Sequence, residues 1–271
     1  MSLPAPSPHT TSVVTGASSG IGAEIARQLA ARGRGVTLVA RRELKLLELA
    51  EALQARYGVR AEVLTADLTE PDARANLATE LDTRGLRADV LVNNAGFTTW
   101  GPVHKGAADR DIGMIRTDVE AVAHLCSLFL PGMVEHGAGV VLNVASTAAF
   151  QPLPGQAGYA ASKAFVLSYS QAIRAELHGT GVSVTVLCPG PVETGFAEAV
   201  GISDDEAANS LPRFMWVPVA EVAKAAVEGM DKGRSVVIPG VANQAGSLLG
   251  HLTPRTLLLP LLSRQHPALK D

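Results

Sequence analysis

The sequence predicts an α/β fold in which helices cover both faces of a doubly wound parallel sheet. Short β-branched runs alternate with longer segments of helical periodicity along most of the chain. These apolar runs are continuous, which is typical of strands that are buried on both faces. We expect about seven strands, predicted by the runs Ser12–Thr15, Val36–Val39, Ala61–Leu64, Val90–Val92, Val140–Val144, Val182–Leu187 and Ser235–Ile238.

The segments between these runs carry the apolar spacing of amphipathic helices. Ile21, Ile25 and Leu29 follow one another at four-residue steps. A second apolar stripe follows the next run and comprises Leu44, Leu47, Ala50, Ala52 and Leu53. Strands separated by helices form βαβ units, so the alternation favours one sheet with parallel crossovers.

This alternation continues to about residue 238 and favours a single catalytic domain over residues 11–271. Residues 1–10 lack a basic and an apolar region of the secretory type and are expected to form a mobile tail. Two segments break the pattern. We expect residues 191–218 to form a substrate loop and residues 241–271 to form an apolar C-terminal tail.

The composition argues against several classes of protein. A net charge of −3 with 4% aromatic residues disfavours nucleic-acid binding, which needs a basic face or stacking platforms. Cys126 and Cys188 lie in apolar stretches without metal-ligand spacing, so we expect buried free thiols and no metal site. No apolar run reaches the roughly 20 residues that span a bilayer. A cytoplasmic location is the default expectation.

The first strand leads directly into a glycine-rich turn, Thr15-Gly-Ala-Ser-Ser-Gly-Ile-Gly22, and a helix follows. The first glycine permits a sharp turn, the second lets a phosphate approach the backbone, and the third allows close packing of helix on strand. The helix N-terminus then directs unpaired N–H groups at an anion. The candidate cofactor-binding residues here are Gly16, Ser18, Ser19, Gly20, Ile21 and Gly22.

A second constellation follows the fifth predicted strand. Ser146 stands at the carboxyl end of that strand, where ligands bind in open α/β sheets. Tyr159 and Lys163 follow it, four residues apart, and so share one face of a helix. A tyrosine pKa of about 10 is too high for base catalysis near neutrality, and a nearby ammonium group lowers it. Ser146 can donate a hydrogen bond to a substrate oxygen on which charge develops.

The glycine turn TGASSGIG together with the Ser146, Tyr159-x-x-x-Lys163 arrangement resembles the short-chain dehydrogenase/reductase family. The resemblance implies a Rossmann fold and an oxidoreductase that interconverts a carbonyl and a secondary alcohol, with Tyr159 as acid in reduction and base in oxidation. It also implies cofactor contacts from Asp67, Leu68, Asn93, Ala95, Gly96, Tyr159, Lys163, Pro189, Gly190, Val192 and Thr194.

The end of the second predicted strand indicates which dinucleotide binds. An NAD site usually has an acidic residue there, whereas this chain has Arg41 and Arg42. A guanidinium can hold a 2′-phosphate through paired charge-assisted bonds, so we expect NADP(H). The family resemblance favours Arg41 as the contact, with Ser18 as a helper. The alternative is that both arginines are solvated residues at the start of the next helix.

One position departs from the family pattern. Many members carry an Asn in the helix before the fifth strand, where it helps hold a water in a proton relay with the lysine, and the matching residue here is Asp118. We hypothesise that Asp118 keeps this catalytic role as a charged neighbour of Lys163, partly offsetting the effect of the lysine on the Tyr159 pKa. The alternative is that Asp118 only braces the backbone.

The remaining expectations concern substrate and assembly. The substrate-facing segments are expected at 97–103, 148–158 and 196–216; they are mostly apolar and favour a neutral, hydrophobic substrate. Phe214, Met215 and Trp216 either form a lid or cover the core. We expect the tail to pack against the body or another subunit, with peripheral membrane attachment less favoured. The family implies a homodimer or homotetramer. The alternative function is a dinucleotide-binding sensor or scaffold without turnover.

Overall fold

A computed structural model describes residues 3–193, 212–265 and 269 of the chain. Its strands form one parallel sheet in the order β3-β2-β1-β4-β5-β6-β7. They are β1 (Thr10–Thr15), β2 (Val36–Ala40), β3 (Ala61–Thr65), β4 (Arg87–Asn93), β5 (Gly139–Val144), β6 (Val182–Leu187) and β7 (Val236–Val237). The prediction of a doubly wound parallel sheet of about seven strands is confirmed.

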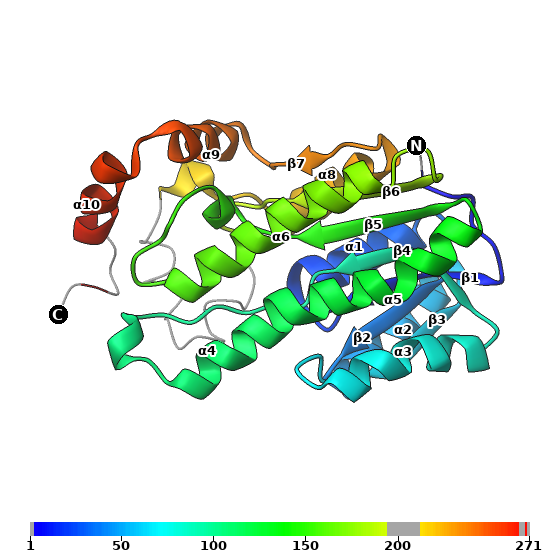
Figure 1. Cartoon of the computed structure of the whole chain (residues 1–271). Coiled ribbons are helices and arrows are strands. Elements are labelled where there is room, and N and C mark those ends of the chain that lie inside the picture. The colour runs from blue at the N-terminus through cyan, green and yellow to red at the C-terminus, as the bar shows by residue number, and fades with distance from the viewer. Residues whose placement is uncertain (1–2, 194–211, 266–268, 270–271) are drawn as a thin grey trace.

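Helices lie on both faces of this sheet (Figure 1). The helices are α1 (Gly20–Ala30), α2 (Glu43–Tyr57), α3 (Pro71–Thr83), α4 (Ala108–Ile115), α5 (Ala121–Glu135), α6 (Ala157–Glu176), α8 (Val219–Asp231), α9 (Val241–Leu252) and α10 (Arg255–Gln265). The short helical turns are η1 (Val103–Lys105), η2 (Arg116–Glu120), η3 (Thr147–Phe150) and η5 (Arg213–Met215). None of the helices among the described residues is both long and apolar enough to cross a bilayer.

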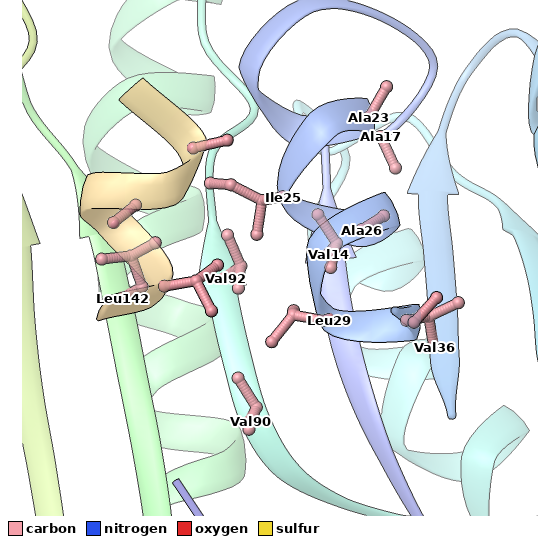
Figure 2. Close-up of a cluster of buried hydrophobic side chains, with 14 of the residues drawn as sticks. Val14, Ala17, Ala23, Ile25, Ala26, Leu29, Val36, Val90, Val92 and Leu142 are labelled. Carbon is pink, nitrogen blue, oxygen red and sulfur yellow. The ribbon is translucent and has the colours of Figure 1, made fainter. Parts of the chain in front are cut away.

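Two apolar cores fill the space between the sheet and its helix layers. One core joins α1, α2 and α8 to one face of the sheet, and the other joins α3, α5 and α6 to the opposite face. Figure 2 shows part of the first core, where Ile25 and Leu29 of α1 lie against Val90 and Val92 of β4. The continuous apolar runs of the sequence have their physical reason here, because each central strand is covered on both sides.

The strand order reverses beside β1, and this reversal positions the site. From β1 the chain moves outward to β2 and β3, and then returns to place β4 on the other side of β1. Loops that leave the carboxyl ends of β1 and β4 therefore diverge, which opens a crevice between them. The glycine turn follows β1, and the segment Asn93–Gly96 follows β4, so both border this crevice.

Five observed strands extend beyond their predicted runs by up to three residues at an end, β6 matches its run, and β7 is the exception. Strand β4 begins at Arg87 instead of Val90, because Arg87 and Ala88 still pair with Thr10 and Thr11 of β1. Strand β7 is shorter than predicted. It pairs only with β6, and Pro239, which lacks an N–H group, follows soon after it.

A buried ion pair ties the amino ends of the central strands together. Arg34, in the turn before β2, binds Asp89 of β4 at 2.6 Å, and both side chains are buried. The same guanidinium donates to Ser12 Oγ at 3.1 Å and to the Pro4 carbonyl oxygen. Leu3 packs against the first core. Arg34 therefore fixes three segments that are distant in sequence.

We expect Asp89→Asn to lower the free energy of unfolding by about 3–5 kcal/mol, because it leaves the buried Arg34 guanidinium without its counter-charge. Urea denaturation followed by circular dichroism measures the loss. The matched control is Asp82→Asn on the exposed side of α3, for which we expect a change within about 0.5 kcal/mol. Equal stabilities of the two variants would contradict this account.

Candidate active site

The glycine turn between β1 and α1 leaves a helix N-terminus available to an anion. Gly16 has a φ of +65°, a conformation that only glycine adopts readily. A Cβ atom on Gly22 would lie 2.6 Å from the Gly16 carbonyl oxygen, so only glycine permits this close packing. Ser19, at the N-cap of α1, makes no side-chain capping bond. The first-turn N–H groups of α1 thus fit a phosphate group, as the sequence predicts.

Hydrogen bonds from Thr15 fix the turn to the neighbouring strand. The Thr15 hydroxyl donates to the Val92 carbonyl and accepts from the N–H groups of Asn94 and Ala95. The Asn94 amide donates in return to the Thr15 carbonyl at 3.0 Å. The carboxyl ends of β1 and β4 are therefore held in one geometry, and both walls of the crevice are rigid.

The two arginines after β2 occupy different places. Arg42 donates to Ser18 Oγ at 2.9 Å and to Ser19 Oγ at 2.6 Å, and so lies on the glycine turn. Arg41 is largely exposed, and its guanidinium lies 3.9 Å from the Asp67 carboxylate. The sequence favoured Arg41 and Ser18; the structure brings Ser18 together with Arg42. Both guanidinium groups nevertheless border the same end of the crevice.

Asp67 stays ionised beside these arginines. Burial raises the pKa of Asp67, but hydrogen bonds from Thr69 and the charge of Arg41 outweigh burial and hold the pKa below its usual value. Its carboxylate accepts from the Thr69 N–H and hydroxyl groups at 3.0 and 2.8 Å. Leu68, the next residue, is buried, and its carbonyl accepts from Arg74. Asp67 therefore presents a fixed negative charge at this end of the crevice.

Asn93 braces the interior of the sheet, and its side chain is buried. Its amide donates to Asn143 Oδ1 at 2.8 Å, and the Asn143 amide donates to Ser170 Oγ at 2.9 Å. Cys126 lies within this network, and burial raises the pKa of its thiol to about 12. The thiol is thus neutral, and the network joins β4, β5, α5 and α6 directly below the crevice.

The predicted catalytic residues come together at the carboxyl end of β5. Ser146 follows β5 and accepts the Ala148 N–H at 3.1 Å at the start of η3. The Ser146 side chain also opposes the rise in the Tyr159 pKa that burial causes. Lys163 lies one helical turn after Tyr159 on α6, with Nζ 5.5 Å from the centre of the tyrosine ring. The phenol, the hydroxyl and the ammonium group therefore form one cluster.

Asp118 is the fourth member of this cluster. Its carboxylate is fully buried and lies 2.9 Å from the Lys163 ammonium, and its second oxygen accepts the Phe97 N–H at 3.1 Å. Lys163 also donates to the Val144 carbonyl at 3.2 Å. A Cβ atom on Gly96 would come within 2.9 Å of the carboxylate, which explains why glycine follows Ala95.

A π-helical turn, η2, aims Asp118 inward between α4 and α5. Buried Arg74 of α3 supports the turn from outside by ion-pairing with Glu120 and donating to His124 Nδ1 at 3.1 Å. Sequence reasoning missed Arg74 and the π-helical turn, because helical periodicity does not reveal one extra residue in a turn.

The charges in this cluster act on one another. Burial raises the Tyr159 pKa, and Asp118 adds to this rise, whereas Lys163 and the hydrogen bond from Ser146 oppose it. Burial would lower the Lys163 pKa, but Asp118 and Tyr159 outweigh burial and raise it. Burial raises the Asp118 pKa against the opposing charge of Lys163. Lys163 therefore keeps its proton at neutral pH, and the carboxylate weakens its pull on the phenol.

The loop after β6 closes the crevice. The Pro189 carbonyl accepts the Thr147 N–H at 2.9 Å, and Val192 packs against the first core. Gly190 lies directly against Asn243, a buried residue of α9 that sequence reasoning missed. Thr194 and the expected substrate residues 196–211 lie outside the described residues.

Two of the expected substrate segments lie side by side. The Gly101 N–H donates to the Gly155 carbonyl at 2.9 Å, and the Gln156 amide donates to Thr98 Oγ1 at 2.9 Å. A cavity of about 210 Å³ between them is lined in part by Trp100, Lys105 and Arg110. A larger, mostly apolar cavity of about 450 Å³ is lined by Ala149, Gln151, Pro152, Leu153, Pro154, Ala157, Ala160, Ala161, Ala164 and Arg255.

Residues 10–205 match the family model described as short chain dehydrogenase. The chain belongs to the short-chain dehydrogenase/reductase family. It is thus an oxidoreductase by family, and the resemblance seen in the sequence is confirmed. The match covers the glycine turn, the Ser146 cluster and the loop after β6.

Named relatives support this assignment. A short chain dehydrogenase of Pseudocercospora fijiensis is 37% identical over 72% of this chain and 62% of its own length. The chain therefore spans less than two thirds of that relative. Sulfoacetaldehyde reductase 2 of Chromohalobacter salexigens is 37% identical over 74% of this chain and 80% of its own. A short-chain dehydrogenase from Sphingobium yanoikuyae, solved in complex with NADPH, is 35% identical, with a TM-score of 0.79 over 93% of this chain and 95% of its own.

Proposed function

We propose that this chain is an NADP(H)-dependent oxidoreductase that interconverts a carbonyl and a secondary alcohol, with Tyr159 as the general acid and base. The observation that carries the proposal is the cluster at the carboxyl end of β5, where Ser146 follows the strand and the centre of the Tyr159 ring lies 5.5 Å from the Lys163 ammonium. That edge of the sheet also carries the glycine turn, which fits a dinucleotide phosphate.

Each residue of the cluster has a separate role in the reaction. A bound nicotinamide supplies or accepts the hydride. Tyr159 donates its proton to the substrate oxygen in reduction and takes a proton from the alcohol in oxidation. Ser146 holds that oxygen and stabilises the charge that develops on it. Lys163 stays protonated and favours the phenolate form of Tyr159.

The preference for NADP(H) is supported by the positive charge at the end of β2. Arg42 already contacts the serine hydroxyls of the glycine turn, and Arg41 lies on the same side of the crevice. Guanidinium groups in this place suit a 2′-phosphate better than a ribose hydroxyl. The NADPH that the Sphingobium relative holds is consistent with this preference.

The substrate class follows from the surroundings of the cluster. The mostly apolar segments 97–103 and 148–158 support a neutral, hydrophobic carbonyl compound or alcohol. Exposed apolar side chains on α4 and α6, among them Ile112, Ile115 and Phe165, support assembly as a homo-oligomer.

Asp118 acts in this proposal as a positioning residue. It holds Lys163 through the 2.9 Å ion pair. Its negative charge partly offsets the effect of the Lys163 charge on the Tyr159 pKa. An Asn at this position would keep a hydrogen bond but would remove the negative charge.

Tyr159→Phe keeps the ring and removes the hydroxyl. We expect NADPH oxidation with ketones and aldehydes to fall by about 10²–10⁴-fold, the usual contribution of a general acid, with dinucleotide binding retained. The control is Tyr169→Phe on the same helix, which stacks on Phe165 and should keep full turnover. Tight NADPH binding by the unaltered chain without turnover on any carbonyl would instead favour a dinucleotide sensor.

Arg41→Ala and Arg42→Ala should each weaken NADPH binding about tenfold or more while changing NADH binding little, because each removes a charge-assisted partner of the 2′-phosphate. Fluorescence titration with both dinucleotides measures the ratio. Lys45→Ala, an exposed cation on α2 paired with Glu48, is the control and should leave the ratio unchanged. Equal losses for both dinucleotides would contradict this assignment of the arginines.

Asp118→Asn should shift the pH dependence of alcohol oxidation. The phenol must be deprotonated to act as base, so the rate rises as pH passes through the Tyr159 pKa. The carboxylate raises that pKa, and its removal should move the rising limb of the profile to lower pH. The control is Asp109→Asn, an exposed residue of α4. Superimposable profiles for Asp118→Asn and the unaltered chain would eliminate this role.

A further inference from the structure

Large apolar side chains gather on one surface formed by η5, α9 and α10. We call this the C-terminal apolar surface. Its members are between 52% and 81% exposed, and they are Phe214, Val241, Leu248, Leu249, Leu252, Leu257 and Leu261. They make up half of the exposed large apolar side chains found among the described residues. Exposed apolar side chains in such numbers indicate a candidate interaction site.

The geometry of α9 explains why these side chains face outward. Val241, Leu248 and Leu252 are separated by seven and four residues and so share one face of the helix. The opposite face is held by the body, where Asn243 and Ser247 are buried. Asn243 donates to the carbonyl oxygens of Met215 and Pro239 at 2.9 and 3.0 Å. The outward face of α9 is therefore fixed by polar contacts on its inner face.

Helices α9 and α10 lie at the same end of the molecule as the carboxyl end of β5, which Ser146 follows (Figure 1). Helix α9 packs on η3, the turn that begins after Ser146: His251 meets the Phe150 ring edge-on at 6.4 Å, and Gly250 touches Gln151. Arg255 of α10 donates to the Phe150 carbonyl at 3.1 Å. The inner side of α9 also meets Gly190 in the loop that closes the crevice.

The charge of residues 232–270 indicates which kind of partner binds the C-terminal apolar surface. Residues 232–270 contain no Asp or Glu, although the chain as a whole is negative. Exposed cations border the apolar side chains: Arg213 beside Phe214, Arg255 at the start of α10 and Arg264 near its end. An apolar helix face with a basic border and no carboxylates fits the interface of an anionic bilayer.

A second copy of the chain fits this surface less well. In a symmetric dimer the C-terminal apolar surface of one copy would contact the same surface of the other copy. The arginines at the two borders would then face one another, and residues 232–270 of neither copy would supply a carboxylate to pair with them. The exposed apolar side chains on α4 and α6 also offer a second copy a different face.

We propose that the C-terminal apolar surface lies on an anionic membrane, with the leucines of α9 and α10 in the acyl boundary and Arg213, Arg255 and Arg264 at the headgroups. Peripheral membrane attachment is the alternative that the sequence favoured less than packing against the body or another subunit. It does not depend on the proposed reaction. A chain docked in this way would present η3 and the loop after β6 close to the lipid. The catalytic crevice would then open near a reservoir of hydrophobic substrate.

The test measures binding of the full chain to sedimented vesicles without substrate or cofactor, so it stands apart from the proposed activity. We expect the chain to sediment with vesicles of equal parts phosphatidylcholine and phosphatidylglycerol, and to be released at high salt or with phosphatidylcholine alone. The triple variant Leu248→Gln, Leu249→Gln, Leu252→Gln should bind the anionic vesicles more than about tenfold more weakly.

Two further variants make the result specific. Leu44→Gln on α2 replaces a leucine that is 75% exposed far from this surface and should bind as the unaltered chain does. Arg264→Gln leaves the apolar residues intact and should weaken binding to anionic vesicles only. Failure of the unaltered chain to sediment at low salt, or equal binding by the triple variant, would overturn the proposal. So would a triple variant whose mass in light scattering falls from dimer to monomer, because a second copy would then cover the surface.

Discussion

The buried ion pair between Lys163 and Asp118 is the interaction on which the catalytic cluster depends. It joins α6 to the π-helical turn between α4 and α5, and Lys163 also reaches the end of β5 through the Val144 carbonyl. Burying either charge alone would be costly, so each group requires the other. The position of the ammonium beneath Tyr159 is thus set by a contact that involves no ligand.

A hydrogen-bonded frame surrounds this pair. The Asn93–Asn143–Ser170 chain runs below the crevice, and Thr15 joins the ends of β1 and β4 above it. Buried hydrogen-bonded networks of this kind specify one arrangement, because each broken bond leaves an unpaired polar atom. The crevice therefore has pre-organised walls.

The C-terminal segment is linked to the same frame by Asn243. This residue fills the space beside Gly190, and it donates to the carbonyl of Met215 at the end of η5 and to that of Pro239 after β7. The helix that exposes the apolar surface is consequently in contact with the loop that closes the crevice. One buried amide thus connects the C-terminal apolar surface with the loop after β6.

The sequence by itself determined the sheet, its seven strands, the glycine turn and the grouping of Ser146, Tyr159 and Lys163. These features follow from short-range rules: the spacing of apolar residues, the φ angle that Gly16 needs, and the four-residue step that places Tyr159 and Lys163 on one helix face. Asp118 was also placed beside Lys163 by the resemblance, and its contact with the lysine is now observed.

Only the tertiary structure decided which arginine lies on the glycine turn, how a π-helical turn aims Asp118, and that Arg74 and Asn243 support the site. Each of these depends on contacts between segments far apart in the chain, such as Arg74 with Glu120 or Asn243 with Gly190. The exposure of the leucines on α9 has the same origin. An apolar stripe predicts a buried face, and only packing against the rest of the molecule decides which face is buried.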